Sequence, residues 1–151
     1  MWYDGRRPWA AYNHALADSL LASLVSAISA AGHPVVNRGL KEDSYFVVRG
    51  GRGFPIFVLG PPRISSTAPA TRATQMPAAL GETLFLSNAV EAALLARDDI
   101  RWAIASGYRQ GLLNYFQLID NGTLAIPDEG FPPDVPNVVT TPAPIVPDGT
   151  R

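Results

Sequence analysis

Glu82 is the residue of this sequence whose type and surroundings most clearly offer chemistry. It interrupts the apolar run of Met76–Asn88 (MPAALGETLFLSN), just ahead of a stretch that opens a helix. A carboxylate in such a place acts either as a general acid–base or as a solvated group favoured by the dipole of a nearby helix start. The other titratable residues and the elements around Glu82 must distinguish these interpretations.

Other patterns that could carry chemistry are incomplete. The sequence has no cysteine, which excludes disulfides and thiolate zinc sites. Its two histidines, His14 and His33, lie on a predicted helix and just past its end without an arranged third ligand, so no metal site is assigned in this chain. The GGRG turn lacks the helix and lysine of a phosphate loop, and Ser65–Thr67 lack the Gly-x-Ser-x-Gly elbow of hydrolases.

Composition bounds the class of protein. With 151 residues, a formal net charge of -1 and 17% charged residues, the chain has the size of one ordinary domain and no electrostatic case for binding nucleic acid or an anionic membrane. No segment reaches the length of a membrane span, and the start of the sequence has no apolar core of signal-peptide length. We therefore expect one domain without a transmembrane segment.

One helix is predicted near the start of the sequence and a second just after Glu82. The first spans Pro8–Ala31, where apolar residues recur at three- and four-residue steps, and Gly32 suits the left-handed conformation that closes a helix. The second opens at Asn88. Glu91 follows three residues on, which is the spacing at which a capping-box glutamate reaches back to the N–H of the cap residue.

A third helix is predicted from Asp98 or Asp99 to about Ile119, where apolar residues keep the 3.6-residue period. Gly107 and Gly111 lower the stability of such a helix. Close packing against a neighbouring element is the expected compensation. The apolar stripes of this helix and of the first one are both expected to cover the faces of a sheet.

Short apolar runs supply the strands of that predicted sheet. Ser44–Arg49 and Phe54–Gly60 flank a glycine-rich turn and are expected to form a hairpin, and a short buried strand is expected just before Glu82. Helices alternating with such strands predict an α/β fold with an open, mainly parallel sheet and flanking helices. The proline-rich stretch from Pro127 onward has no apolar face and is predicted to lack regular structure.

The residues around Glu82 resemble the C-terminal half of the catalytic domain of zinc-dependent N-acetylmuramoyl-L-alanine amidases. The resemblance covers about Met1 to Phe116, is most specific around Glu82, and includes Arg38 and Gly39 as the family's Arg-Gly pair. It divides the chain into a partial amidase-like domain, residues 1–120, and a proline-rich linker or tail, residues 121–151. The matching positions are Met76, Pro77, Leu80, Glu82, Phe85, Leu86, Ser87, Asn88, Glu91, Leu94, Ile104, Ala105, Gly107, Gly111, Tyr115 and Phe116.

This resemblance implies a hydrolase that cleaves the amide between the lactyl group of muramic acid and L-alanine in peptidoglycan. It implies that Glu82 is the catalytic glutamate and that Arg38 orients the substrate end of the site. In the family a zinc ion polarises the carbonyl and activates water, and the glutamate transfers protons between that water and the leaving amine. A location in the cell envelope or outside the cell is implied in the same way.

The sequence departs from the family at the metal and at one insertion. The family's zinc ligands, two histidines and a glutamate, lie on earlier strands that this sequence does not contain, so we expect the isolated chain to be a C-terminal portion without activity. The alternatives are a non-catalytic peptidoglycan-binding or regulatory remnant of the fold, and an unrelated α/β domain in which Glu82 is structural. The insertion Gly50–Gln75 forms either a rim of the substrate cleft or a surface excursion.

Overall fold

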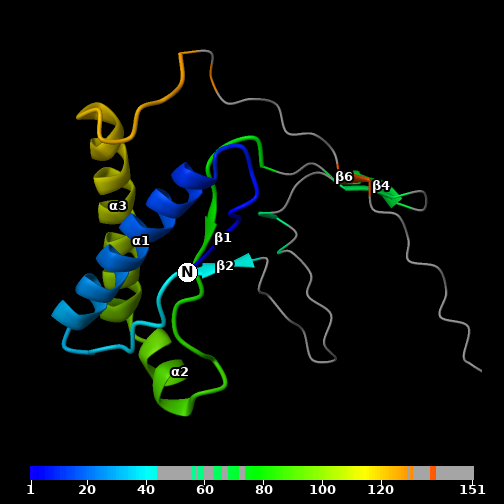
Figure 1. The fold of residues 1–151 in the computed structure, drawn as a ribbon. Coiled ribbons are helices and arrows are strands. Elements are labelled where there is room, and N and C mark those ends of the chain that lie inside the picture. Colours follow the sequence, from blue (N-terminus) through cyan, green and yellow to red (C-terminus); the bar gives the residue numbers. More distant parts are fainter. Residues whose placement is uncertain are drawn as a thin grey trace, which may run out of the picture.

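The computed structural model describes residues 1–43, 56, 58–59, 63–65, 68–71, 74–128, 130 and 137–138. Within these residues the fold is mostly helical, and two long helices lie side by side with a small sheet next to them (Figure 1). The helices are α1 (Ala10–Ala30), α2 (Ala89–Leu95) and α3 (Asp98–Asp120). The long-range packing of the described residues is dominated by the contact of α1 with α3.

Helix α1 confirms the predicted first helix to within two residues at each end. Trp9 occupies its N-cap position and is almost fully buried, while Pro8 precedes it in a turn. Gly32 has a φ of +85°, the left-handed conformation predicted for it, and its N–H donates to the carbonyl of Ser29. Leu16 and Leu20 of the predicted apolar stripe are buried and pack with Tyr115 of α3 in the core.

The glycines of α3 allow the two long helices to approach at backbone distance. A methyl group on Gly111 would come within 2.7 Å of Leu20 Cα, and one on Gly107 would come within 3.0 Å of Leu24 Cα. The predicted close packing at these two glycines is therefore confirmed. Their neighbour is the backbone of α1 rather than a sheet.

A three-stranded sheet adjoins α1. Its strands are β1 (Trp2–Tyr3), β2 (Lys41–Glu42) and β5 (Ala79–Leu80), in the order β2–β1–β5. Strand β1 pairs in parallel with β2 and antiparallel with β5, with Trp2 opposite both Lys41 and Leu80. The strand predicted ahead of Glu82 is present as β5, although its two residues are half-buried rather than buried. Its pairing with β1 places the start of the chain next to it.

The predicted open, mainly parallel sheet with flanking helices is wrong. The described sheet next to the helices is mixed, its strands are two residues long, and α1 and α3 pack on each other instead of covering a sheet from either side. Small residues explain the outcome, because Gly107 and Gly111 let α3 bury one face directly on α1. The opposite face of α3 leaves Trp102 and Phe116 exposed.

Buried polar groups tie the loop after β1 to the rest of the fold. Asp4 is fully buried and accepts hydrogen bonds from Arg6, from the backbone N–H at 2.8 Å and from the guanidinium at 2.9 and 2.8 Å. Arg6 Nη2 also reaches Asp43 Oδ1 at 2.7 Å, and Asp43 is fully buried as well. Asn13 joins the same loop to the segment before β5, since its amide donates to the Asp4 carbonyl and accepts from the Ala78 N–H, each at 2.8 Å.

A second sheet consists of β3 (Arg63–Ser65), β4 (Ala68–Thr71) and β6 (Asn137–Val138). Strands β3 and β4 form an antiparallel pair within the stretch predicted as a proline-rich loop, and β6 pairs in parallel with β3. One short strand thus lies in the tail, where no regular structure was predicted. The predicted hairpin of Ser44–Arg49 and Phe54–Gly60 falls almost entirely outside the described residues.

Candidate functional site

Glu82 lies two residues past the end of β5 and is exposed. Its Oε2 accepts a hydrogen bond of 3.1 Å from the indole Nε1 of Trp2, a residue 80 positions earlier in the chain. The β1–β5 pairing explains this contact, because it sets Trp2 directly opposite Leu80. The carboxylate is therefore oriented by a fixed donor while it stays accessible to solvent.

The backbone around Glu82 rests against α3. A methyl group on Gly81 would come within 2.1 Å of the Tyr108 hydroxyl, so the chain lies against this side chain, which would have to move to admit a larger residue. The same hydroxyl is 3.3 Å from Thr83 Oγ1. Tyr108 thus supports the residues on both sides of Glu82.

The turn after Glu82 is held by its own polar groups. Asn88 caps α2, since its Oδ1 accepts from the N–H groups of Val90 and Glu91 at 3.0 and 3.4 Å. Glu91 reaches further back than a capping box predicts, because its Oε2 accepts from the Phe85 N–H at 2.5 Å. The Asn88 N–H donates to the Phe85 carbonyl instead. Between these contacts Leu84 has a φ of 65°, a conformation that costs a non-glycine residue free energy.

Arg38 lies next to this turn. Its guanidinium carbon is 4.6 Å from the centroid of the Phe85 ring, which is a cation–π contact with a residue three positions past Glu82. Both side chains are exposed. Of the two predicted site residues, Arg38 thus lies beside the turn that follows Glu82, and its contact there is with Phe85.

A cavity of about 470 Å³ adjoins Trp2. The ammonium of Lys41 lies 5.3 Å from the centroid of the Trp2 ring. Neither Lys41 nor Trp2 is among the site residues predicted from the sequence. No local signal could reveal the contact of Trp2 with Glu82 or that of Lys41 with Trp2, because both depend on the register of β1 with β2 and β5. The lining residues are Trp2, Tyr3, Leu40, Lys41 and Glu42.

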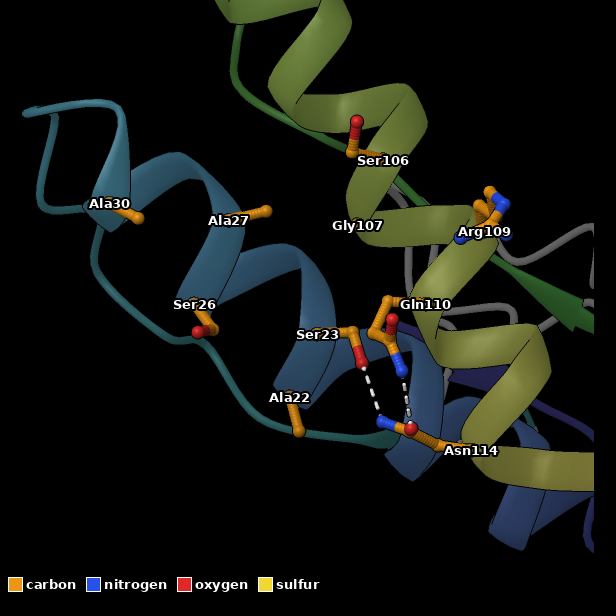
Figure 2. A pocket seen from close by; sticks show the side chains of 10 residues that line it. All are labelled: Ala22, Ser23, Ser26, Ala27, Ala30, Ser106, Gly107, Arg109, Gln110 and Asn114. Carbon is orange, nitrogen blue, oxygen red and sulfur yellow. Dashed lines mark hydrogen bonds between the residues drawn. The ribbon is translucent and has the colours of Figure 1, made fainter. Parts of the chain in front are cut away.

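A second cavity, of about 490 Å³, lies between α1 and α3 (Figure 2). Asn114 crosses it by donating to Ser23 Oγ at 3.1 Å, and it accepts from Gln110 Nε2 at 2.8 Å. Among the described residues that line it, Arg109 is the only ionisable one, and they form no acid–base pair. The other lining residues are mostly small, namely Ala22, Ser23, Ser26, Ala27, Ala30, Ser106 and Gly107.

The described side chains do not fit a catalytic zinc ion. His14 packs edge-on against Tyr3, with 5.1 Å between the ring centroids, and His33 follows Gly32 at the end of α1. Over the part of the chain that the structure describes, no three His, Asp or Glu side chains come together as a ligand set. A zinc site of the family type requires three such ligands.

Comparison with known proteins gives no match to a protein-family model, to a curated protein or to a solved structure. Among the described residues, no helix is both long and apolar enough to span a membrane.

Proposed function

We propose that this chain supplies the C-terminal part of an N-acetylmuramoyl-L-alanine amidase, with Glu82 as its general acid–base. The observation that carries the proposal is the setting of Glu82. The carboxylate lies exposed just past β5, within the Met76–Asn88 motif, and Trp2 donates to one of its oxygens. The structural interpretation, a carboxylate placed only to favour a helix start, explains less, because the N-terminus of α2 already has Asn88 as its cap and Glu91 in its first turn.

The chemistry of this proposal uses the free oxygen of the Glu82 carboxylate. The Trp2 indole occupies Oε2 and leaves Oε1 for a water that attacks the amide between the muramic acid lactyl group and L-alanine. Glu82 accepts a proton from that water as the new C–O bond forms. It then delivers the proton to the alanine nitrogen as the C–N bond breaks. Arg38, beside Phe85 at the same turn, binds the acidic substrate near this site.

A second candidate follows from the missing ligand set. Because the described histidines and carboxylates do not form a zinc site, the chain would serve as a peptidoglycan-binding or regulatory remnant if no other segment supplied the ligands. The two candidates share the substrate and differ in turnover. They are therefore separated by an assay of cleavage rather than of binding.

The test compares the 151-residue chain with a fused domain. In the fused domain, the zinc-ligand-bearing strands of an active N-acetylmuramoyl-L-alanine amidase precede Met1. Each protein is incubated with a muramoyl-peptide and added zinc, and release of the free peptide is measured. Circular dichroism and metal analysis establish that both proteins are folded and report how much zinc each holds.

We expect background cleavage from the chain alone and zinc-dependent cleavage from the fused domain. A folded, zinc-loaded fused domain without turnover would exclude the amidase in favour of the binding remnant. Robust cleavage by the chain alone would contradict the assignment of the metal ligands to another segment.

A further inference from the structure

Helix α3 is apolar on two opposite sides. Its buried side, which includes Gly107, Gly111 and Tyr115, packs on α1. At 3.6 residues per turn, Trp102 and Phe116 lie on the far side of the helix from Gly111, and both are exposed. We call this second side the outer face of α3. Its residues, all of them exposed, are Trp102, Ala105, Ser106, Arg109, Leu112, Leu113 and Phe116.

The apolar area of the outer face is large for a surface left to solvent. The exposed fractions of Trp102 and Phe116 are 72% and 54%, and an aromatic side chain offers about 150–250 Å² for burial, so the two together present roughly 200–300 Å². Leu112 and Leu113 are also exposed and add to this area. An apolar patch of this size marks a site where another molecule docks.

The two aromatic residues of the outer face are placed symmetrically about Arg109. Trp102 precedes Arg109 by seven residues and Phe116 follows it by seven, which is about 10 Å along the helix in each direction. If a second copy of α3 lies antiparallel with Arg109 at the twofold axis, Trp102 of each copy meets Phe116 of the other. An interface between identical copies requires this reciprocity, whereas a contact with an unrelated molecule does not.

The flanks of the outer face complete the same pattern. In the antiparallel arrangement, Ala105 lies opposite the partner's Leu112 on one flank, and Ser106 lies opposite the partner's Leu113 on the other. Each large side chain thus meets a small one. This alternation lets two helices approach closely without a clash.

The charges at the ends of α3 are compatible with an antiparallel contact. In the first turn, Asp98 pairs with Arg101 and Asp99 pairs with Arg97. This turn therefore carries balanced charges beside the positive end of the helix dipole. Asp120, in the last turn, would come next to the first turn of the partner, where a carboxylate is stabilised by that dipole.

We propose that the outer face of α3 is the interface of a homodimer in which two copies of α3 lie antiparallel, with Arg109 at the twofold axis. Two outer faces, with the polar side chains that flank them, would bury roughly 1,000 Å², the lower end for a specific interface, so the dimer is reversible. The two Arg109 side chains are long and exposed, so their stems pack while their guanidinium groups turn to solvent. The interface lies outside the candidate site and does not depend on the proposed function.

The first test is sedimentation velocity of the 151-residue chain at micromolar to millimolar concentration. We expect a monomer–dimer equilibrium. Trp102→Ser should raise the dissociation constant about tenfold or more, because a few large aromatic residues carry much of the binding energy of an interface. Val36→Ser, which removes an exposed apolar side chain from the connector after α1, should change it by less than about twofold. Circular dichroism checks that both variants keep the native helix content.

The second test determines the register by cross-linking. The chain has no cysteine, so an introduced cysteine has no competing thiol. In Arg109→Cys the two cysteines face each other at the axis, with Cα atoms roughly 4–6 Å apart for helices packed at about 8–10 Å, and mild oxidation should give a covalent dimer. In Ser106→Cys the two cysteines are about 9 Å apart along the helices, beyond the reach of a disulfide, and the chain should stay uncross-linked.

Three results would overturn the proposal. A native chain that stays monomeric at millimolar concentration would show that another molecule covers the outer face. A dimer whose dissociation constant is unchanged in Trp102→Ser would place the contact elsewhere on the molecule. Cross-linking of Ser106→Cys as complete as that of Arg109→Cys would contradict the antiparallel register. If Trp102→Ser loses its helix content, the cross-linking pair decides alone.

Discussion

The two halves of this molecule are held together in different ways. The α1–α3 pair relies on shape, since Gly107 and Gly111 let two helix backbones meet with no side chain between them. The loop after β1 relies on charge, since two buried carboxylates, Asp4 and Asp43, share the guanidinium of Arg6. The candidate site is built on the second half. Glu82 is oriented by β1, the strand that leads into this charged loop.

This difference indicates which changes each half tolerates. A tightly packed helix contact fails abruptly when a small residue becomes large, because backbone atoms cannot move aside. A polar network loses stability roughly in step with the number of hydrogen bonds removed, and an exposed arginine can compensate by turning its guanidinium to solvent. Damage to the helix pair should therefore exceed damage to the loop.

The largest effect is expected for Gly111→Val. Even the first carbon of the new side chain would come within 2.7 Å of Leu20 Cα and 2.9 Å of the Ser19 carbonyl oxygen, so the helices must separate. We expect a loss of about 3 kcal/mol in the free energy of unfolding, measured by urea denaturation. Gly107→Ala serves as the milder comparison. The added methyl group would come no closer than 3.0 Å to α1, and alanine has a higher helix propensity than glycine. A loss of unfolding free energy as large as that of Gly111→Val would contradict the claim that the helices are packed more tightly at Gly111 than at Gly107.

Asp4→Asn should have an intermediate effect. The carboxylate accepts three hydrogen bonds from Arg6, and an amide oxygen cannot replace them all. We expect the free energy of unfolding to fall by about 2 kcal/mol. This is less than the cost of breaking a fully buried ion pair, because the Arg6 side chain is 41% exposed. Asp18→Asn, at an exposed position of α1, is the matched control and should change the free energy of unfolding by less than about 0.5 kcal/mol. Equal effects of the two substitutions would show that the buried network contributes nothing.

The pH dependence of stability should reveal Asp43. Burial raises its pKa, the charge of Asp4 adds to this, and Arg6 and the Ile56 N–H partly oppose it. The folded state therefore holds the Asp43 proton more tightly than the unfolded state does, so Asp43 favours folding least when it is ionised. Its contribution to the free energy of unfolding declines as pH rises from the pKa of the unfolded chain, 3.8, through the higher pKa of the folded state. The stability of the native chain relative to Asp43→Asn should therefore fall over that window. A relative stability that rises with pH there would contradict the sign.

The smallest effect on stability is expected at the candidate catalytic residue. Glu82 is exposed, and glutamine keeps an oxygen that can accept from the Trp2 indole. Glu82→Gln should change the free energy of unfolding by less than about 0.5 kcal/mol in the same urea experiment. A loss of 2 kcal/mol or more would show that this carboxylate has a structural role.

Local patterns in the sequence predicted the helices and their ends well. The spacing of Leu16, Leu20 and Leu24 marked the buried side of α1, and Gly32 marked its end, because these signals depend only on neighbouring residues. The glycines of α3 predicted close packing without revealing the partner. The open parallel sheet was wrong because strands of two residues carry almost no periodicity, so the sequence could not distinguish helix-on-helix packing from helix-on-sheet packing.

The candidate site was predicted only in part for the same reason. Glu82 and Arg38 were identified from motifs close in sequence. Trp2 reaches Glu82, and Lys41 reaches Trp2, only through pairing across the sheet, between segments about 80 and 40 residues apart. The charged loop at Asp4 was missed because its partner, Asp43, lies at the end of a connector that resembles a solvated surface segment.

The most direct test of the account is the turnover of Glu82→Gln in the fused domain, with Asp18→Asn as the control. Both variants should fold and hold zinc as the parent does, since neither residue belongs to the packed core or to a ligand set. The account predicts that Glu82→Gln slows cleavage of a muramoyl-peptide by about 10²–10⁴-fold, the typical contribution of a general acid–base, while Asp18→Asn stays within about twofold of the parent. Equal rates for the two variants would contradict the assignment of Glu82 as the proton-transferring residue.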